Sequence, residues 1–212
     1  GLSANATSNM SSAAAISSPQ VFDRALFVRR QIAATDDVAQ GPLQGPSQGP
    51  SQELLQALEQ RIVEDLTERI AVINRSFADT LLIGHHLSAV AAALMGLGRN
   101  GAVREQVLSS DDDLKLSALS CDCSISLMDL HGINDVPGYL AQVATALRPD
   151  GLAVFGFFAG GSLSELRESW LVAEQELTGG ASPRVAPMID LREAGGLLQR
   201  AGLALPVADL DR

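Results

Sequence analysis

The sequence lacks any long uninterrupted apolar run. A helix that spans a bilayer needs about 18 consecutive apolar residues, and the two richest windows, Ala89–Leu97 and Leu152–Phe158, are both shorter than that. We therefore expect no membrane span. The 212 residues, 46% hydrophobic and 19% charged, instead describe one globular domain that can bury a substantial core.

Basic side chains are scarce as well. Fifteen lysines and arginines stand against 25 aspartates and glutamates, which gives a formal charge of -10. A chain of this charge attracts nucleic acid phosphates and anionic lipid headgroups only weakly, so we expect no nucleic acid partner. A protein, a peptide or a small molecule fits better, and a homo-oligomer stays open.

Only two cysteines occur, Cys121 and Cys123. Because they lie two residues apart on an expected strand, we expect them to share one face, where the geometry disfavours a disulfide between them. Free thiols indicate a reducing compartment. A zinc site with His85 and His86 is disfavoured, since neighbouring histidines on an extended turn point apart and C-x-C lacks the usual two-residue gap. We expect no metal.

Three segments precede the main domain. Residues 1–20 are rich in serine and alanine and lack the apolar core of a secretory signal, so we interpret them as a disordered segment, a tag remnant or a stub left by processing. Residues 21–34 predict a helical arm that packs on something, with Arg24, Arg29 and Arg30 on its polar side. Residues 35–52 repeat Gln-Gly-Pro and predict a mobile linker.

The region 53–212 reads as an α/β domain. Its strongest helical pattern covers Glu53–Asn74, with Ser51 as the expected cap. Apolar residues recur there at three- and four-residue steps: Leu55, Leu58, Ile62, Leu66, Ile70 and Ile73. The remaining elements alternate, with strands expected at Thr80–Gly84, Cys121–Met128, Leu152–Phe158 and Leu203–Ala208, and helices at Ser88–Met95, Gly138–Leu147, Ser162–Leu177 and Asp190–Ala201. This alternation predicts a mostly parallel twisted sheet with helices on both faces.

Ligands of such sheets bind beyond the carboxyl ends of the strands. The loops to inspect are therefore Gly84–Ser88, Met128–Asp135 and Phe158–Ser162. His131 follows a strand in this position and is the best single candidate for site chemistry. The residues after it have a second interpretation, since Asn134 and Asp135 precede Pro137 and could simply cap the next helix.

Several segments together resemble one family, the class I methyltransferase-like proteins related to BioC and to the mitochondrial complex I assembly factor 5. They are Val21–Leu26 with Arg29-Arg30, Cys121–Leu127 leading to His131–Asp135, Leu147–Gly151, Gly160–Arg167, Gly179–Pro187 and Leu197–Gly202. The resemblance is strongest to the alphaproteobacterial and mitochondrial branch. It implies a Rossmann-like, seven-stranded sheet that binds S-adenosylmethionine.

The resemblance implies two different activities. The mitochondrial members hydroxylate an arginine of a complex I subunit during assembly, whereas the BioC members methylate a malonyl thioester. A complex I subunit would then be the protein partner. The location would be the mitochondrial matrix in a eukaryote and the cytoplasm in a bacterium.

The cofactor positions of the family are only partly matched. Gly84 matches the first glycine of the turn after the first strand, but His86 and Ser88 stand at the next two glycine positions and Leu82 replaces an acidic residue. Asp111, Asp112 and Asp113 match an acidic loop beside the adenine, but the simpler interpretation is a solvated charged turn. The sequence predicts a degenerate cofactor turn.

The chain is also short for the resemblance. Too few residues lie between Met95 and Asp122 for a complete strand, helix and further strand, so one βα unit is expected to be shortened or missing, and the C-terminal strand could lack its partner. The resemblance places Gly160–Arg167 at the border of the cleft. Trp170, the only tryptophan, falls near Leu163, Leu166 and Val172 and is interpreted as a core residue.

Three functions remain open from the sequence. The first is a methyltransferase-fold protein that serves respiratory complex I assembly or arginine modification. The second is an active S-adenosylmethionine-dependent methyltransferase of BioC type. The third is a noncatalytic binding protein that kept the fold after it lost the cofactor site.

Overall fold

The domain is built on a four-stranded parallel sheet. The computed structural model describes residues 21–29, 52–85, 87–109, 112–182 and 184–210. Within these residues the strands are β1 (Phe77–Ile83), β2 (Asn100–Gln106), β3 (Cys121–Leu127) and β4 (Leu147–Gly156), in the order β2-β1-β3-β4. Every neighbouring pair is parallel.

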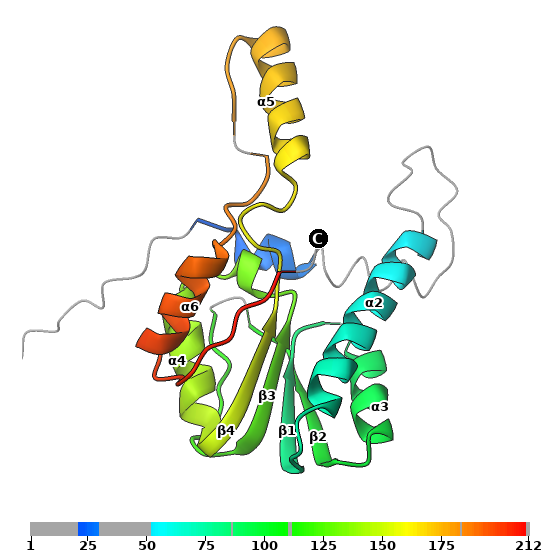
Figure 1. Ribbon diagram of the computed structural model, residues 1–212. Coiled ribbons are helices and arrows are strands. Elements are labelled where there is room, and N and C mark those ends of the chain that lie inside the picture. The colour runs from blue at the N-terminus through cyan, green and yellow to red at the C-terminus, as the bar shows by residue number, and fades with distance from the viewer. Residues whose placement is uncertain (1–20, 30–51, 86, 110–111, 183, 211–212) are drawn as a thin grey trace, which may run out of the picture.

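Helices cover both faces of this sheet, as the sequence predicts (Figure 1). On one face lie α2 (Gln52–Ala71) and α3 (Ser88–Gly96), and on the other lie α4 (Val136–Ala146) and α6 (Leu191–Arg200). Alternate residues of β1 therefore enter different cores. Leu82 packs in the cluster of α2 and α3, whereas Leu81 and Ile83 pack in the cluster of α4.

Helix α2 confirms the strongest helical pattern of the sequence. Leu66 and Ile70 are 4% and 2% exposed, and Ile62 packs against the same cluster. The side chain of Leu58 and the cap position Ser51 lie outside the described residues. At the other end of the helix, Arg99 donates from NH1 to the carbonyl oxygens of Ala71 and Ile73 at 3.0 and 2.9 Å, which satisfies carbonyls that a helix end leaves open.

The expected gap between the second and third strands is real. β2 ends at Gln106, and the described residues between it and β3 contain no helix and no strand. The four strands of the described residues are therefore fewer than the seven that the family resemblance implies. One βα unit is missing because Val107–Ser120 is too short to hold a helix and a strand.

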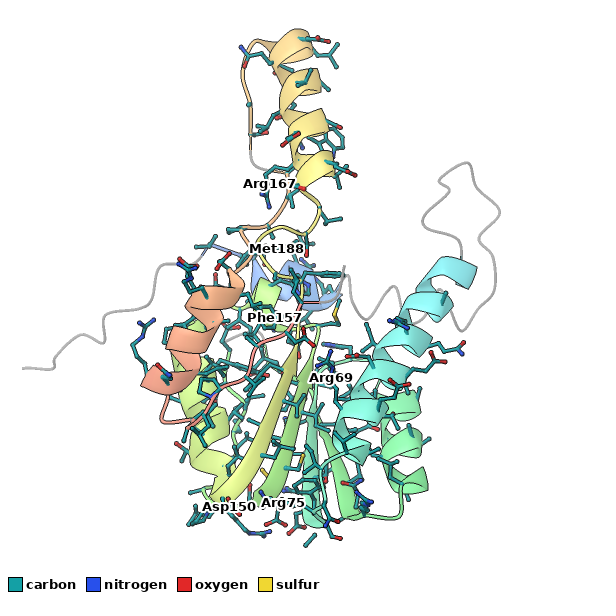
Figure 2. The ribbon with its side chains drawn as sticks, viewed as in Figure 1. Arg69, Arg75, Asp150, Phe157, Arg167 and Met188 are labelled. Carbon is teal, nitrogen blue, oxygen red and sulfur yellow. The ribbon has the colours of Figure 1, made fainter. Side chains whose placement is uncertain are left out.

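The predicted strand at Leu203–Ala208 is wrong. The described tail after α6 has no strand, and Leu205 and Val207 are 92% and 93% exposed. Pro206 cannot donate to a ladder, and these apolar side chains find no face to cover. The tail instead reaches α2, where Asp209 pairs with Arg69 at 2.9 Å (Figure 2).

The prediction that the two cysteines share a face is also wrong. Cys121 packs in the cluster of α4, and Cys123 packs in the cluster of α2 and α3. The pairing of β3 with β4 shifts register between these two residues, and such an irregularity turns the chain by one position. Both thiols are buried and free, and burial raises the pKa of Cys123 to about 12.

Trp170 is not a core residue. It lies on α5 (Ser164–Thr178), which extends away from the sheet (Figure 1), and it is 46% exposed. Nor does Val172 share its side of the helix, since two residues of an α-helix are rotated by about 200°. The sequence pattern of α5 is amphipathic, but its apolar side meets no layer of the domain.

The N-terminal segments are described only in part. Residues 24–29 are helical, which agrees with the expected arm, while residues 1–20, the rest of the arm and residues 35–51 of the linker lie outside the described residues. No helix that the structure describes is both long and apolar enough to cross a membrane.

Candidate functional site

The candidate site lies at the carboxyl ends of β1, β3 and β4. Gly84 and His85 follow β1, Met128–Asp135 follows β3, and Phe157 and Phe158 follow β4. The helical arm of residues 24–29 lies across this end of the sheet (Figure 1). The arm and the three strand ends together form what we call the strand-end site.

Asn134 fastens the arm to the domain. Its Oδ1 accepts hydrogen bonds from the backbone N–H groups of Val21 and Phe22, both at 2.7 Å, and its Nδ2 donates to the Phe22 carbonyl at 3.1 Å. Asp135 is instead the N-cap of α4 and accepts from the Gly138 N–H at 2.9 Å. The capping interpretation is therefore confirmed for Asp135, whereas Asn134 binds the arm.

Arg24 is buried, although the sequence predicts it on the polar side of the arm together with Arg29 and Arg30. It is 3% exposed, its NH1 donates to the Gly132 carbonyl at 3.0 Å, and its Nε lies 3.0 Å from Oδ1 of Asp112. Its guanidinium also lies 5.0 Å from the centre of the Phe27 ring. The apolar side of the arm could not show this, because Arg24 is buried by partners distant in sequence.

Asp112 is the buried partner of Arg24. It is 9% exposed, its φ is 59°, and its Oδ2 accepts from the Asn134 N–H at 2.8 Å. Asp113 forms a local turn in which its Oδ1 accepts from the Lys115 N–H at 2.9 Å. The interpretation of a solvated charged turn is thus wrong for Asp112, and its carboxylate is already bound by groups of the chain itself. Asp111 lies outside the described residues.

His131 lies in a short 3-10 helix (Leu130–Gly132) between two aromatic rings. The ring centres of Phe27 and Phe158 are 5.9 and 5.5 Å from that of the imidazole. Its Nδ1 is buried and has no hydrogen-bond partner among the residues that the structure describes. Burial, with a smaller contribution from the positive charge of Arg24, lowers the pKa of His131, so the ring is neutral at pH 7.

The turn after β1 matches the family pattern at one position. Gly84 has φ 136°, and a Cβ there would lie 2.6 Å from the Leu127 carbonyl oxygen and 3.3 Å from Oδ2 of Asp129. Only glycine fits here, because the turn after β1 passes close to the backbone at the end of β3. His85 follows, with its Nδ1 4.0 Å from Oδ1 of the buried Asp129.

Two further cofactor positions of the family carry no carboxylate in this chain. Leu82 is fully buried in the cluster of α2 and α3, and β2 ends at Gln106, whose side-chain amide donates to the Val107 carbonyl at 3.1 Å. Ser88 is exposed at the first position of α3, and His86 lies outside the described residues. The described part of the chain holds no group of three or more histidine, cysteine, aspartate or glutamate side chains placed for a metal ion.

The acidic residue of β3, Asp122, serves the opposite end of the sheet. It accepts from the Ala78 and Asp79 N–H groups at 3.1 and 3.0 Å and pairs with Arg148 at 3.0 Å. The hydrogen bond from Arg148 is the main reason that the pKa of Asp122 is lowered. Its role is structural, and it takes no part in the strand-end site.

Replacing Gly84 with alanine is expected to destabilise the domain by about 2 kcal/mol or more. The added Cβ meets a backbone oxygen that cannot move away, and φ 136° is strained for alanine. Urea unfolding would measure the loss. Gly161→Ala is the control, since a Cβ there meets nothing within 4 Å, and it should change stability by less than about 0.5 kcal/mol. Equal stabilities of the two variants would contradict the geometry of the turn.

Sequence reasoning named Arg24 and Asn134 but missed their roles in the strand-end site, and it missed Phe27 altogether. Phe27 packs on Gly132 so closely that a Cβ on the glycine would lie 2.6 Å from its ring. Val21 and Asn134 are 113 residues apart, so no local pattern reveals their contact. The one available signal was the shared occurrence of the arm motif and the His131–Asp135 motif in the family resemblance.

Comparison with known proteins confirms that resemblance. No family model matches the chain. Over 105 residues, 50% of the chain, it is 37% identical to the mitochondrial arginine-hydroxylase NDUFAF5 of Mus musculus, and the match covers 31% of that protein. It is also 32% identical over 108 residues to the putative methyltransferase RP459 of Rickettsia prowazekii, with 50% of the chain and 47% of the relative covered.

A further relative is a malonyl-acyl-carrier-protein O-methyltransferase of Laribacter hongkongensis. It is 34% identical over 101 residues, which cover 48% of the chain and 32% of the relative. The chain thus matches from about a third to about half of the length of these relatives.

Solved structures support the fold class. A chain of the complex between the Haloferax volcanii Trm112 methyltransferase activator and the putative methyltransferase matches with a TM-score of 0.54 at 14% identity, covering 72% of this chain and 73% of that one. The cyclase SpnF matches with a TM-score of 0.50 at 11% identity, covering 85% and 72%. The domain has a Rossmann-like class I methyltransferase fold, here with four strands in the described residues.

Proposed function

We propose that this chain is a methyltransferase-fold protein that acts on a protein partner during the assembly of respiratory complex I, with a complex I subunit as the partner and its arginine as the candidate target. The observation that carries the proposal is the 37% identity to the mitochondrial arginine-hydroxylase NDUFAF5 over half of the chain. The buried pair of Arg24 and Asp112 commits the acidic loop to the chain's own arm, which favours this choice over an ordinary methyltransferase. The location that goes with it is the mitochondrial matrix in a eukaryote and the cytoplasm in a bacterium.

The strand-end site fits S-adenosylmethionine poorly. The ligand carries a cationic amino group and two ribose hydroxyls, which carboxylates at the ends of β1 and β2 would normally bind. Leu82 and Gln106 stand near those ends, and Asp112 is bound by Arg24. Gly84 keeps the backbone conformation that the cofactor requires, but Leu82 and Gln106 offer the cofactor no carboxylate.

His131 is the candidate for chemistry at the site. Its neutral imidazole can accept a hydrogen bond, its Nδ1 lacks a partner among the described residues, and Phe27 and Phe158 hold the ring in place. Because Phe27 belongs to the arm, a substrate that reaches His131 from this side must displace residues 24–29. No catalytic role is proposed for the remaining cofactor positions. They enter the proposal only as a degenerate cofactor turn and its acidic loop: Gly84, His86, Ser88 and Asp111–Asp113.

S-adenosylmethionine is expected to bind weakly. Loss of one charged hydrogen-bond partner costs a few kcal/mol, and each 1.4 kcal/mol is tenfold in affinity, so a micromolar dissociation constant becomes about millimolar. Isothermal titration calorimetry would measure it. A dissociation constant in the low micromolar range would overturn this part of the proposal and favour an active methyltransferase.

The role in assembly is tested by deletion of the gene in its source organism. We expect membranes of the deletion strain to lose assembled complex I on a native gel, together with its NADH oxidation activity, and the gene for the full protein to restore both. Unchanged complex I in the deletion strain would contradict the proposal. The activity of another respiratory complex is the control.

A second function is kept because of one observation, the 34% identity to a malonyl-acyl-carrier-protein O-methyltransferase. Methyl transfer to a malonyl thioester would require tight cofactor binding, so the titration separates the two functions. A noncatalytic binding protein on the same fold is the third, and it shares the weak cofactor binding. If the protein is such a noncatalytic binding protein, His131→Ala should leave complex I assembly intact, whereas the first function predicts that assembly is impaired.

A further inference from the structure

Helix α5 and the described residues of the returning segment, 179–182 and 184–187, form a hairpin that we call the outer arm. Figure 1 shows it projecting away from the sheet, beyond the strand-end site. Its two sides are joined by Glu174, which accepts from the Ser182 N–H at 2.7 Å and from Nε of Arg184 at 2.5 Å. Glu174 is the only buried residue of α5. The outer arm is therefore a built element whose interior is polar.

Four apolar residues of α5 form a stripe along one side of the helix. At about 100° per residue, their positions fall within roughly 60° of arc. They are Leu166, Trp170, Ala173 and Leu177. Leu166 and Trp170 are both 46% exposed, and Leu177 is 84% exposed. An apolar stripe of this spacing is the pattern by which one helix packs on another.

A groove borders this stripe. A cavity of about 250 Å³ is lined by Arg167, Trp170 and Leu171 of α5 and by residues of the returning segment that include Arg184 and Val185. The guanidinium of Arg184 lies 5.9 Å from the centre of the Trp170 ring. Tryptophan and arginine around an apolar groove are the residue types that dominate binding energy at protein interfaces.

The two flanks of the stripe carry opposite charges. Arg167 lies on the flank beside the groove, at the base of the outer arm (Figure 2), and no ion pair is recorded for it within the described residues. Glu165 and Glu176 lie on the other flank and are exposed. In an antiparallel pair of two α5 helices, these two glutamates would face each other across the interface, and each chain carries a charge of -10. A second copy is therefore a poor occupant.

We propose that the outer arm docks an amphipathic helix of the partner protein, one whose apolar stripe is flanked by carboxylates on one side and by basic residues on the other. The carboxylates face Arg167, the basic residues face Glu165 and Glu176, and a large apolar side chain enters the groove beside Trp170. This inference rests on the proposed function in that it names the surface by which the partner is held. It assigns that surface to the outer arm and not to the strand-end site.

Trp170 makes a direct test possible, because it is the only tryptophan in the chain. Three synthetic helical peptides without tryptophan share one apolar stripe and carry mixed, all-acidic or all-basic flanks. We expect the mixed peptide to shift the Trp170 emission to shorter wavelength and to bind at least about tenfold more tightly than the other two. Arg167→Glu should make the all-basic peptide the tightest. No emission shift with any peptide, or equal affinities for all three, would overturn the inference.

Two variants separate the stripe from the rest of α5. The double substitution Leu166→Ser with Leu177→Ser removes exposed side chains, so the variant should fold normally. Its affinity for the mixed peptide should fall at least about tenfold. Val172→Ser, at a position 59% exposed on the opposite side of the helix, should leave the affinity unchanged. The inference would be contradicted if both variants lost the same affinity for the mixed peptide. It would also be contradicted if the full protein formed a dimer that the double substitution dissociates, because the stripe would then bind a second copy.

The deletion strain distinguishes failure of the docking inference from failure of the proposed function. If the wild-type gene restores complex I and the doubly substituted gene restores it equally, the docking inference is wrong and the proposed function stands. If deletion leaves complex I unchanged, the proposed function is wrong and the peptide titration still decides the docking. Restoration by wild type and Val172→Ser, with loss in the double variant, supports both.

Discussion

Leu66→Asp is expected to prevent soluble folding of the protein. Leu66 is 4% exposed in the cluster that joins α2 and α3 to the sheet. Truncating a buried leucine costs about 2–5 kcal/mol, and an uncompensated buried carboxylate adds several more. The total approaches the roughly 5–15 kcal/mol by which a domain is stable. The soluble yield after expression is the first measurement.

The matched control for this change is Val72→Asp. Val72 directly follows α2 and is 83% exposed, so the same new side chain enters water there. We expect normal yield and a melting temperature within a few degrees of wild type, since exposed substitutions change stability by about 0.5 kcal/mol. If Leu66→Asp were as soluble and as heat-stable as this control, α2 would not pack as described.

Arg24→Ala is expected to lower the free energy of unfolding by about 3 kcal/mol. Removing one partner of a buried ion pair leaves the other charge buried without compensation, at a cost of about 3–5 kcal/mol. The low end applies here, because residues 21–29 could detach and let water reach Asp112. Urea unfolding measures the change. Arg29→Ala, on the same arm but exposed, should change stability by less than about 0.5 kcal/mol.

A double-mutant cycle tests whether the effect comes from the pair itself. Arg24→Ala and Asp112→Ala each remove one of the two charges, and the double variant removes both. Because the residues lie in contact, the sum of the two single losses in unfolding free energy should exceed the loss of the double variant by about 1–3 kcal/mol. Additive losses would mean that Arg24 stabilises the arm through Gly132 and Phe27 alone.

Local patterns predicted the layers of the fold but not the strand-end site. The apolar spacing of α2 and the apolar runs of β1 and β3 are properties of neighbouring residues, and so is the Asp135 cap. The contacts of Arg24 and Asn134 join segments far apart in the chain, and burial of an arginine contradicts its usual place at the surface.

Two further predictions are wrong for reasons that the neighbouring residues do not reveal. An amphipathic helix predicts that its apolar side is covered, and this pattern places Trp170 in the core, but it does not identify the surface that covers the helix. The cysteine faces followed from strict alternation along β3, and a local shift of register breaks that alternation. Neither an uncovered helix side nor a register shift can be recognised from the sequence of the residues concerned.

The irregularity in β3 gives the protein a thiol in each of its two layers. Cys121 is sealed by α4, and Cys123 is sealed by α2 and α3. A thiol-specific reagent reaches either sulfur only when the helices that cover it move away. The modification rate of each cysteine therefore reports how often its own layer opens. Peptide mapping after timed labelling would then tell whether the two faces of the sheet open together or one at a time, without any engineered probe.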